Sequence, residues 1–373
     1  MQILITGGAG YIGSHTLISL DKAGYDFVVY DNLCNSSEES IKRVEKIIGK
    51  SIKFEYGDIR DKDALDRVFE KYDIGSVIHF AGLKAVGESV SQPLEYYDNN
   101  VNGTLVLLHV MKQHNCKKIV FSSSATVYGD PATTPIKEDF PVGQITNPYG
   151  RNKYFIEEIL QDLYKSDNEF QVVILRYFNP VGAHKSGTIG EDPNGIPNNL
   201  MPFIAQTAVG KREFLSVFGG DYDTPDGTGV RDYIHVEDLA DGHVQAINYI
   251  EDKTTTLNPL VVNLGTGNGY SVLDMVKAFE KASGKKVAYK IVQRREGDIA
   301  KCYSDTSFAK EVLNWEAKRD IQEMCEDSWK WQSLNPNGYA KWMKNNWTLY
   351  WEVTGSYEKN DKWIKCSFFL LYG

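Results

Sequence analysis

The chain carries one pair of residues, Tyr149 and Lys153, whose types and spacing suit proton transfer at a hydroxyl group. Asn147 is a favourable helix cap and Pro148 suits the first helical position, so the sequence predicts a helix with Tyr149 and Lys153 on one face, one turn apart. A free phenol has a pKa of about 10, and a fixed ammonium nearby favours the phenolate and lowers that pKa. The pair therefore predicts a tyrosine base that can take a proton from a sugar or alcohol.

The same spacing recurs at Tyr249 and Lys253, which we interpret as a solvated helix end. Two residues four apart on a helix are neighbours in any chain, so spacing alone does not define a site. Whether Tyr149 and Lys153 form a site therefore depends on the elements that position them.

Length and composition indicate a globular protein with room for two domains: 373 residues with a formal net charge of -9. No apolar run is long enough to span a membrane, and residues 2–6 resemble a buried strand rather than a signal peptide, so we expect a cytoplasmic protein without membrane contact. The five cysteines are scattered and never form a Cys-x-x-Cys pair, which predicts free thiols and no metal site. The negative charge argues against nucleic-acid binding, so local arginines must meet any anionic substrate.

The N-terminal segment predicts a dinucleotide-binding turn. An apolar strand at residues 2–6 runs into Gly7, Gly10 and Gly13, and a helical pattern follows. Glycines at this spacing let the backbone turn tightly and approach a pyrophosphate, while the helix N-terminus offers N–H groups to the phosphates. A second strand ends at Asp31, 18 residues after the last glycine, where a carboxylate can bind both hydroxyls of an adenosine ribose. We therefore expect NAD rather than NADP.

Strands and helices then alternate, with strand patterns at 52–56, 77–80 and 118–122. This alternation predicts an α/β fold, a Rossmann-type doubly wound parallel sheet with a smaller C-terminal substrate-binding α/β domain. The expected boundaries are 1–180 for the NAD-binding domain, to which some later segments return, 181–339 for the substrate domain, and 340–373 for an atypical tail rich in tryptophan.

Ligands of such a sheet lie at the carboxyl ends of its strands. Those ends carry Asp58 and Ile59 after the third strand, residues 81–84 after the fourth, and residues 122–124 after the fifth. Each cluster by itself fits a turn or cap as well as a ligand site. Their shared position in the expected sheet makes them candidates for one cleft.

The regular pattern breaks after a strand at 171–177. We expect a hairpin around 221–229, and we interpret the second glycine turn at 265–269 as a tight turn facing the cleft, because no acid follows it at the right distance. Arg294 and Arg295 lie in a loop, where they can be solvated or bind an anion.

The assembled residues resemble the extended short-chain dehydrogenase/reductases, and within them the UDP-glucose (UDP-galactose) 4-epimerase family. The resemblance runs from Met1 to about Tyr339 and does not include the tail. Its specific segments are residues 6–15, 122–129, 147–150, 176–184, 199–202 and 231–236.

The resemblance implies reversible epimerisation of UDP-glucose and UDP-galactose at C4, through a 4-keto sugar and tightly bound NAD, in a homodimeric enzyme of galactose metabolism. Ser124, Tyr149 and Lys153 are the implied catalytic residues, and all three also contact the cofactor. The other implied NAD-binding residues are Gly7, Gly10, Tyr11, Ile12, Gly13, Asp31, Asn32, Asn35, Ser36, Asp58, Ile59, Phe80, Ala81, Gly82, Lys84, Asn99 and Phe178. The implied substrate-binding residues are Ser124, Tyr149, Asn179, Asn199, Leu200, Val217, Phe218, Arg231, Arg295, Asp298 and Cys302.

The family also implies a specificity position at Cys302. A small residue there resembles members that accept UDP-GlcNAc and UDP-GalNAc, whereas a bulky Tyr resembles members restricted to plain hexoses. Neighbouring Tyr303 can close the same space, so both outcomes stay open.

Two other functions compete with epimerisation. Nucleotide-sugar 4,6-dehydratases resemble this chain through the Tyr and Lys but carry an Asp-Glu pair where this chain has Ala125 and Thr126 near Ser124. A non-catalytic NAD-sensing protein on the same fold is the second alternative. Such a protein would have little reason to combine Ser124, Tyr149 and Lys153.

Overall fold

The computed structural model describes residues 1–195, 197–252, 254–295 and 297–340. Met1–Pro336 form one compact unit, and the fold and the site described below lie within it. The predicted tail lies outside the described residues from residue 341 onward, as does Lys253. The domain boundary at 180 stays a prediction.

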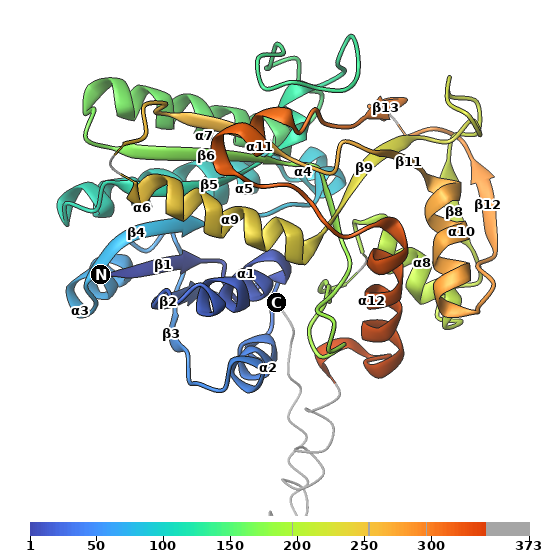
Figure 1. The fold of residues 1–373 in the computed structure, drawn as a ribbon, viewed down its shortest axis with the longest axis horizontal. Helices are drawn as coiled ribbons and strands as arrows, with labels where there is room; N and C mark the ends of the chain where they lie inside the picture. The colour runs from blue at the N-terminus through green and yellow to red at the C-terminus, as the bar shows by residue number, and fades with distance from the viewer. Residues whose placement is uncertain (196, 253, 296, 341–373) are drawn as a thin grey trace, which may run out of the picture. The chain divides into compact units, whose positions relative to one another are not determined.

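A seven-stranded parallel sheet lies at the centre of this unit, in the order β10-β6-β5-β4-β1-β2-β3 (Figure 1). The order reverses between β1 and β4, so the loop after β1 lies at the topological switch point where such sheets bind ligands. The strands are β1 (Gln2–Thr6), β2 (Phe27–Asp31), β3 (Lys53–Tyr56), β4 (Ile74–His79), β5 (Lys118–Ser124), β6 (Gln171–Tyr177) and β10 (Leu260–Leu264).

Helices cover both faces of the sheet because successive side chains of each strand point into two different apolar layers. Ile3 and Ile5 of β1 pack into one layer, whereas Leu4 packs into the other. The predicted doubly wound sheet is confirmed. The first layer includes α1 (Tyr11–Lys22), α2 (Glu38–Ile48), α9 (Val236–Glu251) and α11 (Ser307–Leu313), and the second includes α3 (Lys62–Lys71), α6 (Gly103–Gln113) and α7 (Pro148–Ser166).

Short helices lead into α6 and follow β5. A π-helical segment, η1, continues directly into α6, and such segments are frequent at functional sites. The short elements are α4 (Val86–Ser91), α5 (Pro93–Tyr96), η1 (Tyr97–Asn102) and the 3₁₀ helix η2 (Ala125–Tyr128), with η3 (Gly338–Ala340) beyond the compact unit.

The later part of the unit contains two smaller sheets and a third apolar cluster. β9 pairs with β7, β11 and β13, and β8 pairs with β12. Strand β10 comes from this part of the chain but joins the large sheet beside β6. The elements are β7 (Asn179–Val181), α8 (Leu200–Ala208), β8 (Leu215–Phe218), β9 (Val230–His235), β11 (Gly269–Ser271), α10 (Val272–Ser283), β12 (Tyr289–Val292), β13 (Lys301–Cys302) and α12 (Ile321–Leu334).

The hairpin predicted around 221–229 is wrong. β8 ends at Phe218 and pairs with β12, whereas β9 begins at Val230 and belongs to a different sheet. The segment between them therefore connects two sheets. Its Gly and Asp residues favour turns irrespective of which strands those turns join.

Candidate active site

Helix α7 begins as predicted and presents the Tyr and Lys pair. The Asn147 side chain accepts a 2.8 Å hydrogen bond from the Gly150 N–H, which caps the helix. The Lys153 Nζ atom lies 5.9 Å from the centre of the Tyr149 ring. Ser124 ends β5, and its hydroxyl is close enough to the Tyr149 phenol to lower the phenol's pKa. The three residues predicted for catalysis thus come together at the carboxyl end of the sheet.

The electrostatics of the pair differ from the expectation. Burial raises the pKa of Tyr149 to about 12, and the Ser124 hydroxyl offsets only part of that rise. The Lys153 ammonium donates a 2.6 Å hydrogen bond to the Ser122 carbonyl, so it is held against β5. Burial lowers the pKa of Lys153 to about 8, while the charge of Glu157 acts to raise it. In this arrangement burial outweighs the effects that lower the pKa of the phenol, so the net shift is opposite to the one predicted.

A buried polar network lies behind these residues. Glu157 accepts hydrogen bonds from Arg176 Nε at 3.1 Å and Nη2 at 2.7 Å, and the Ser123 hydroxyl also donates to it. Arg176 Nη1 donates to the Tyr128 oxygen at 2.9 Å. Glu157 and Arg176 are 1 % and 4 % exposed, so their charges are paired away from water. This network fixes the ends of β5 and β6 beside the candidate site.

The turn after β1 has room for glycine alone. Gly7 has a φ of +72°, and a Cβ there would lie 2.7 Å from the Ala81 nitrogen. A Cβ on Gly13 would lie 2.6 Å from the Gly7 carbonyl oxygen. Gly10 caps α1 without any side-chain hydrogen bond, so no polar side chain at the cap competes with a ligand for the N–H groups of the first turn. This arrangement fits a pyrophosphate group at the helix N-terminus.

Two carboxylates border the turn. Asp31 accepts hydrogen bonds from the Ala9 N–H at 2.9 Å and the Ser36 hydroxyl at 3.0 Å, and burial raises its pKa. Asp58 accepts a 3.0 Å hydrogen bond from the Asn32 amide. Asp31 is the last residue of β2 and Asp58 follows the adjacent strand β3, so both carboxylates lie at the same edge of the sheet.

The remaining predicted cofactor residues surround this edge. The Phe80 and Ala81 N–H groups both donate to the Thr6 carbonyl, at 2.9 and 3.0 Å, which joins the loop after β4 to β1. Asn100 accepts hydrogen bonds from the Leu83 N–H and the Asn99 amide. Others are placed as follows: Tyr11 and Ile12 in the first turn of α1, Asn35 in the loop after β2, buried Ile59 after β3, Gly82 packed near Asn100, and buried Phe178 after β6.

Three predicted substrate residues form a cluster after β8 and β12. Arg295 donates hydrogen bonds to Asp298 at 2.9 and 3.3 Å, and its guanidinium lies 4.7 Å from the centre of the Phe218 ring. Arg231 and Arg295 both act to lower the pKa of Tyr233, although burial raises it to about 12. The two predicted arginines are therefore close to the same residue.

The other predicted substrate residues are more dispersed. Asn199 precedes α8, and Leu200 begins it. Asn179 is exposed in β7, whereas Cys302 is 9 % exposed and packs in a cluster with Phe178. The Val217 side chain is 1 % exposed and packs in the core beneath β8, so the substrate-binding role of this residue stays a prediction. Its inward direction follows from strand alternation, which leaves Phe218 facing outward.

Sequence reasoning missed two candidates that the fold brings to this edge. Glu191 accepts hydrogen bonds from Lys84 at 3.3 Å and Asn199 at 2.6 Å, joining a predicted cofactor residue to a predicted substrate residue. Tyr177 pairs with Ser124 across β5 and β6, and its hydroxyl contacts His243. The available sequence signal for Glu191 was a carboxylate in a segment rich in Gly, Pro and Asn.

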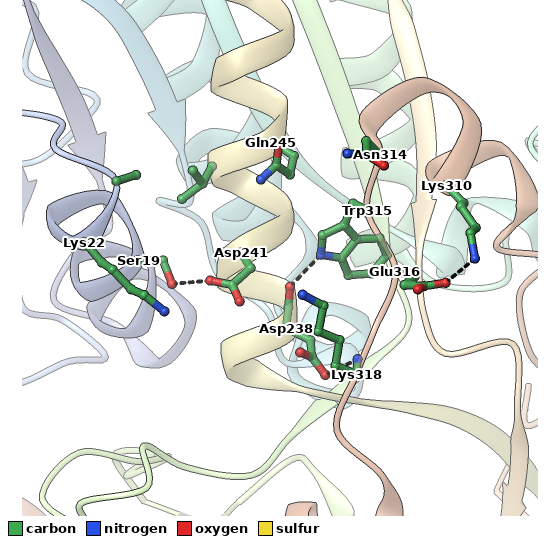
Figure 2. Close-up of a pocket in the computed structure, with 12 residues that line it drawn as sticks. Ser19, Lys22, Asp238, Asp241, Gln245, Lys310, Asn314, Trp315, Glu316 and Lys318 are labelled. Carbon is green, nitrogen blue, oxygen red and sulfur yellow. Dashed lines mark hydrogen bonds and ion pairs between the residues drawn. The ribbon is translucent and has the colours of Figure 1, made fainter.

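A separate cavity of about 530 Å³ lies among α1, α9 and the segment after α11 (Figure 2). Its carboxylates already have partners: Asp241 accepts from the Ser19 hydroxyl at 2.8 Å, and Glu316 pairs with Lys310 at 2.6 Å. Trp315 forms part of its wall and donates to a backbone carbonyl of α9. We assign no chemistry to it.

Within the described parts of the chain, no helix is long and apolar enough to cross a membrane. The same parts contain no group of three or more His, Cys, Asp or Glu residues that could hold a metal ion. The cysteines at 34, 116, 302 and 325 are free thiols.

Comparisons with known proteins cover nearly the whole described chain. A family model described as GDP-mannose 4,6 dehydratase matches residues 4–328. The UDP-glucose 4-epimerase of Bacillus subtilis is 62 % identical over 339 residues, covering 91 % of this chain and 99 % of that protein. The human UDP-glucose 4-epimerase is 57 % identical over 345 residues, covering 91 % of this chain and 98 % of that protein.

A solved structure agrees with these relatives. The crystal structure of Bifidobacterium longum UDP-glucose 4-epimerase in complex with NAD+ and UDP is 56 % identical, with a TM-score of 0.87. It covers 91 % of this chain and 100 % of its own. The chain therefore belongs to the UDP-glucose 4-epimerase family of the extended short-chain dehydrogenase/reductases.

Proposed function

We propose that this chain interconverts UDP-glucose and UDP-galactose by inverting C4 of the sugar through a 4-keto intermediate, with NAD held throughout the cycle. The observation that carries the proposal is the convergence of Ser124, Tyr149 and Lys153 at the edge of the sheet that also carries a turn where only glycine fits. Relatives at 57–62 % identity named as UDP-glucose 4-epimerases support it. So does the related structure with NAD+ and UDP.

The residues at the sheet edge fit a dinucleotide. The glycine turn and the first turn of α1 would hold the pyrophosphate, because the tight packing at Gly7 and Gly13 leaves no space for side chains there. Asp31 would bind the adenosine ribose, and Asp58 would bind the adenine. Lys153 would bind the ribose of the nicotinamide. Bound there, a nicotinamide would accept the C4 hydride in its oxidised form and, once reduced, would give it back to the opposite face of the ketone.

Tyr149 is the proposed proton acceptor for the sugar 4-hydroxyl, and Ser124 the donor that holds the same oxygen. Because the pKa of Tyr149 is about 12, the phenol is protonated at neutral pH until positive charge close by favours its phenolate. The Lys153 ammonium is the positive charge that the chain itself provides on the same helix face. Tyr149 would then return the proton when the ketone is reduced.

Arg231 and Arg295 are the proposed ligands of the UDP diphosphate. Both lie close to Tyr233, and a guanidinium fork matches phosphate oxygens. Arg295 now pairs with Asp298, so the substrate would replace part of that ion pair. These side chains would supply the local positive charge that the net charge of -9 does not.

The 4,6-dehydratase alternative lacks its acid and base. Ala125 has no polar group, and the Thr126 hydroxyl donates a 3.1 Å hydrogen bond to Ser124. The purified protein incubated with UDP-galactose alone should form UDP-glucose without added reductant. A 4-keto-6-deoxy product would favour the dehydratase, and no product at all would favour the NAD-sensing alternative.

We also propose that UDP-GlcNAc and UDP-GalNAc are substrates. Cys302 is small and pairs with Arg231 across β13 and β9, beside the proposed pocket. The Tyr303 ring lies instead against β11, where a Cβ on Gly269 would approach it to 3.1 Å. Cys302→Tyr should lower turnover of UDP-GalNAc relative to UDP-galactose, since overpacking costs about 1–3 kcal/mol. An unchanged ratio, or a parent protein inactive on UDP-GalNAc, would reject this extension.

The proposed active unit is a homodimer. Val90, Leu94 and Phe155 on α4, α5 and α7 are 63 %, 82 % and 43 % exposed, which leaves an apolar surface on these helices. The resemblance to the family implies that the helical segments at residues 93–115 and 148–165 form the interface. Sedimentation at micromolar concentration should give twice the monomer mass, and a monomer would exclude a stable dimer.

The proposed compartment is the cytoplasm. The four described cysteines are unpaired, as is usual for proteins kept in a reducing compartment. Fractionation of cells that produce the protein would test this assignment, and recovery with membranes or in the medium would contradict it.

A further inference from the structure

The Asp58 carboxylate is fully occupied by donors from its own chain. Its Oδ1 atom accepts from the Arg60 backbone N–H at 2.9 Å and from Arg60 Nε at 3.0 Å. Its Oδ2 atom accepts from Arg60 Nη2 at 2.9 Å and from the Asn32 amide at 3.0 Å. An ionised carboxylate offers about four lone-pair positions, so Arg60 fills three and Asn32 the fourth.

Arg60 also reaches the helix that begins at α5. Its Nη1 atom donates to Asp98 at 2.8 Å and to Glu95 at 3.4 Å. Asp98 lies in η1, the π-helical segment that also contains Asn99 and Asn100, which hold the loop after β4. Arg60 therefore joins three segments around the proposed dinucleotide site: the end of β3, the loop after β2 through Asn32, and η1.

The arrangement fixes both the charge and the direction of Asp58. Hydrogen bonds from Arg60 lower the pKa of Asp58 to about 2, so the carboxylate is ionised at any physiological pH. A planar guanidinium bonded through two nitrogens restricts rotation of its carboxylate partner. The Asn32 amide is a neutral donor with one hydrogen bond to the carboxylate, so it is the weaker of the two partners.

We propose that Arg60 is a positioning residue for the adenine end of the dinucleotide: it holds Asp58 as an oriented, ionised acceptor, and the Asn32 amide gives way when the adenine amino group binds. This inference rests on the proposed NAD site. An oriented, ionised Asp58 would make the site selective for a base with an amino group at position 6. A base with an oxo group there would place an acceptor against a carboxylate, which has no proton to donate.

The test uses the holoenzyme and a competing dinucleotide. Protein is equilibrated with an excess of NAD and its hypoxanthine analogue in equal amounts, and the retained dinucleotides are quantified after denaturation. Wild type should retain NAD over the analogue by about tenfold or more, because a site built for an amine rejects a group that cannot donate. In Arg60→Gln the ratio should fall to within about threefold of one.

Two further variants separate positioning from general damage. Arg60→Lys keeps the positive charge but lacks the planar, two-pronged guanidinium, so it should give an intermediate ratio. Arg67→Gln, on α3 and exposed, is the matched control and should behave as wild type. UDP affinity should stay within about threefold in all three variants, since the uridine site lies elsewhere.

The outcomes distinguish this inference from the proposed function. A wild-type protein that retains neither dinucleotide contradicts the proposed NAD site itself. A wild-type protein that retains both equally, or an Arg60→Gln variant that keeps the full preference for NAD, overturns the role of Arg60 and leaves the NAD site standing.

Discussion

The proposed cofactor and substrate regions of this protein position their side chains in different ways. Cofactor residues such as Gly7, Asp31 and Ser124 stand at or just beyond the ends of parallel strands, and hydrogen bonds to neighbouring segments or residues fix them. Substrate residues such as Arg295 and Phe218 stand at the ends of short outer strands or in loops, and they contact one another.

This difference suits a cofactor that stays bound between cycles and a UDP-sugar that is released after each one. A strand-end site is rigid before binding, so it can hold a cofactor through many cycles without reorganisation. The Arg295–Asp298 ion pair and the Lys84–Glu191–Asn199 contacts have to rearrange if a diphosphate or sugar enters. We expect changes in the first region to affect chemistry or cofactor retention, and changes in the second to affect substrate affinity.

Tyr149→Phe should give the largest effect. It removes the proposed proton acceptor, so turnover should fall by about 10²-fold or more while UDP-sugar binding changes only a few fold. Steady-state rates and UDP-sugar titration measure the two quantities. Tyr249→Phe is the control, because that hydroxyl donates at 2.8 Å to the Leu257 carbonyl on the surface. Turnover close to wild type in Tyr149→Phe would reject the assignment.

Gly7→Ala should remove most of the bound NAD. The added Cβ would lie 2.7 Å from the Ala81 nitrogen, in a backbone conformation that L residues rarely adopt, so the turn must move away from its pyrophosphate-binding shape. Retained NAD should fall by about tenfold or more. Gly24→Ala is matched, since Gly24 has a φ of +83° but open space around it. Equal NAD loss in both variants would show that the effect is general strain.

Arg295→Gln should raise the KM for UDP-galactose by about tenfold with a smaller change in kcat, because a lost charged contact to phosphate weakens ground state and transition state alike. Arg294→Gln is the neighbouring control, as Arg294 pairs with Asp221 and stacks on Tyr222. A fall in kcat as large as that of Tyr149→Phe would contradict the assignment of this region to substrate affinity rather than to chemistry.

The pH profile should show the smallest effect. Burial lowers the pKa of Lys153 from 10.5 to about 8, so the ammonium form is lost as the pH rises through that value. If the ammonium supports catalysis, kcat/KM should fall roughly fivefold between pH 8 and pH 9. Lys153→Met should lose this decline along with most activity. A rise in kcat/KM over the same range would instead point to the phenol of Tyr149 as the controlling group.

The strand-end region could be predicted from sequence because its chemistry is local. Glycine spacing, the acid after the second strand and the capped helix at Asn147 each depend on neighbours a few residues away. The fold class followed from the alternation of these same elements. These predictions needed no knowledge of which distant segments meet.

The predictions that were wrong or missing depend on contacts between segments that are distant in sequence. The high pKa of Tyr149 arises from burial, and Glu191, Tyr177 and Arg60 gain their partners from segments distant in sequence. The false hairpin arose because turn-forming residues do not specify which strands they connect. Contacts of this kind become visible only once the sheet and its loops are assembled.

In the proposed reaction, the hydride removed from C4 returns to C4 within one enzyme-bound cycle. UDP-galactose carrying deuterium at C4 tests it directly, when it is incubated with the purified protein without added NAD and the product is analysed by mass spectrometry. The product should be UDP-glucose that keeps its deuterium at C4. Product that has exchanged the label for solvent hydrogen, or that forms only when NAD is added as a consumed reactant, would contradict it.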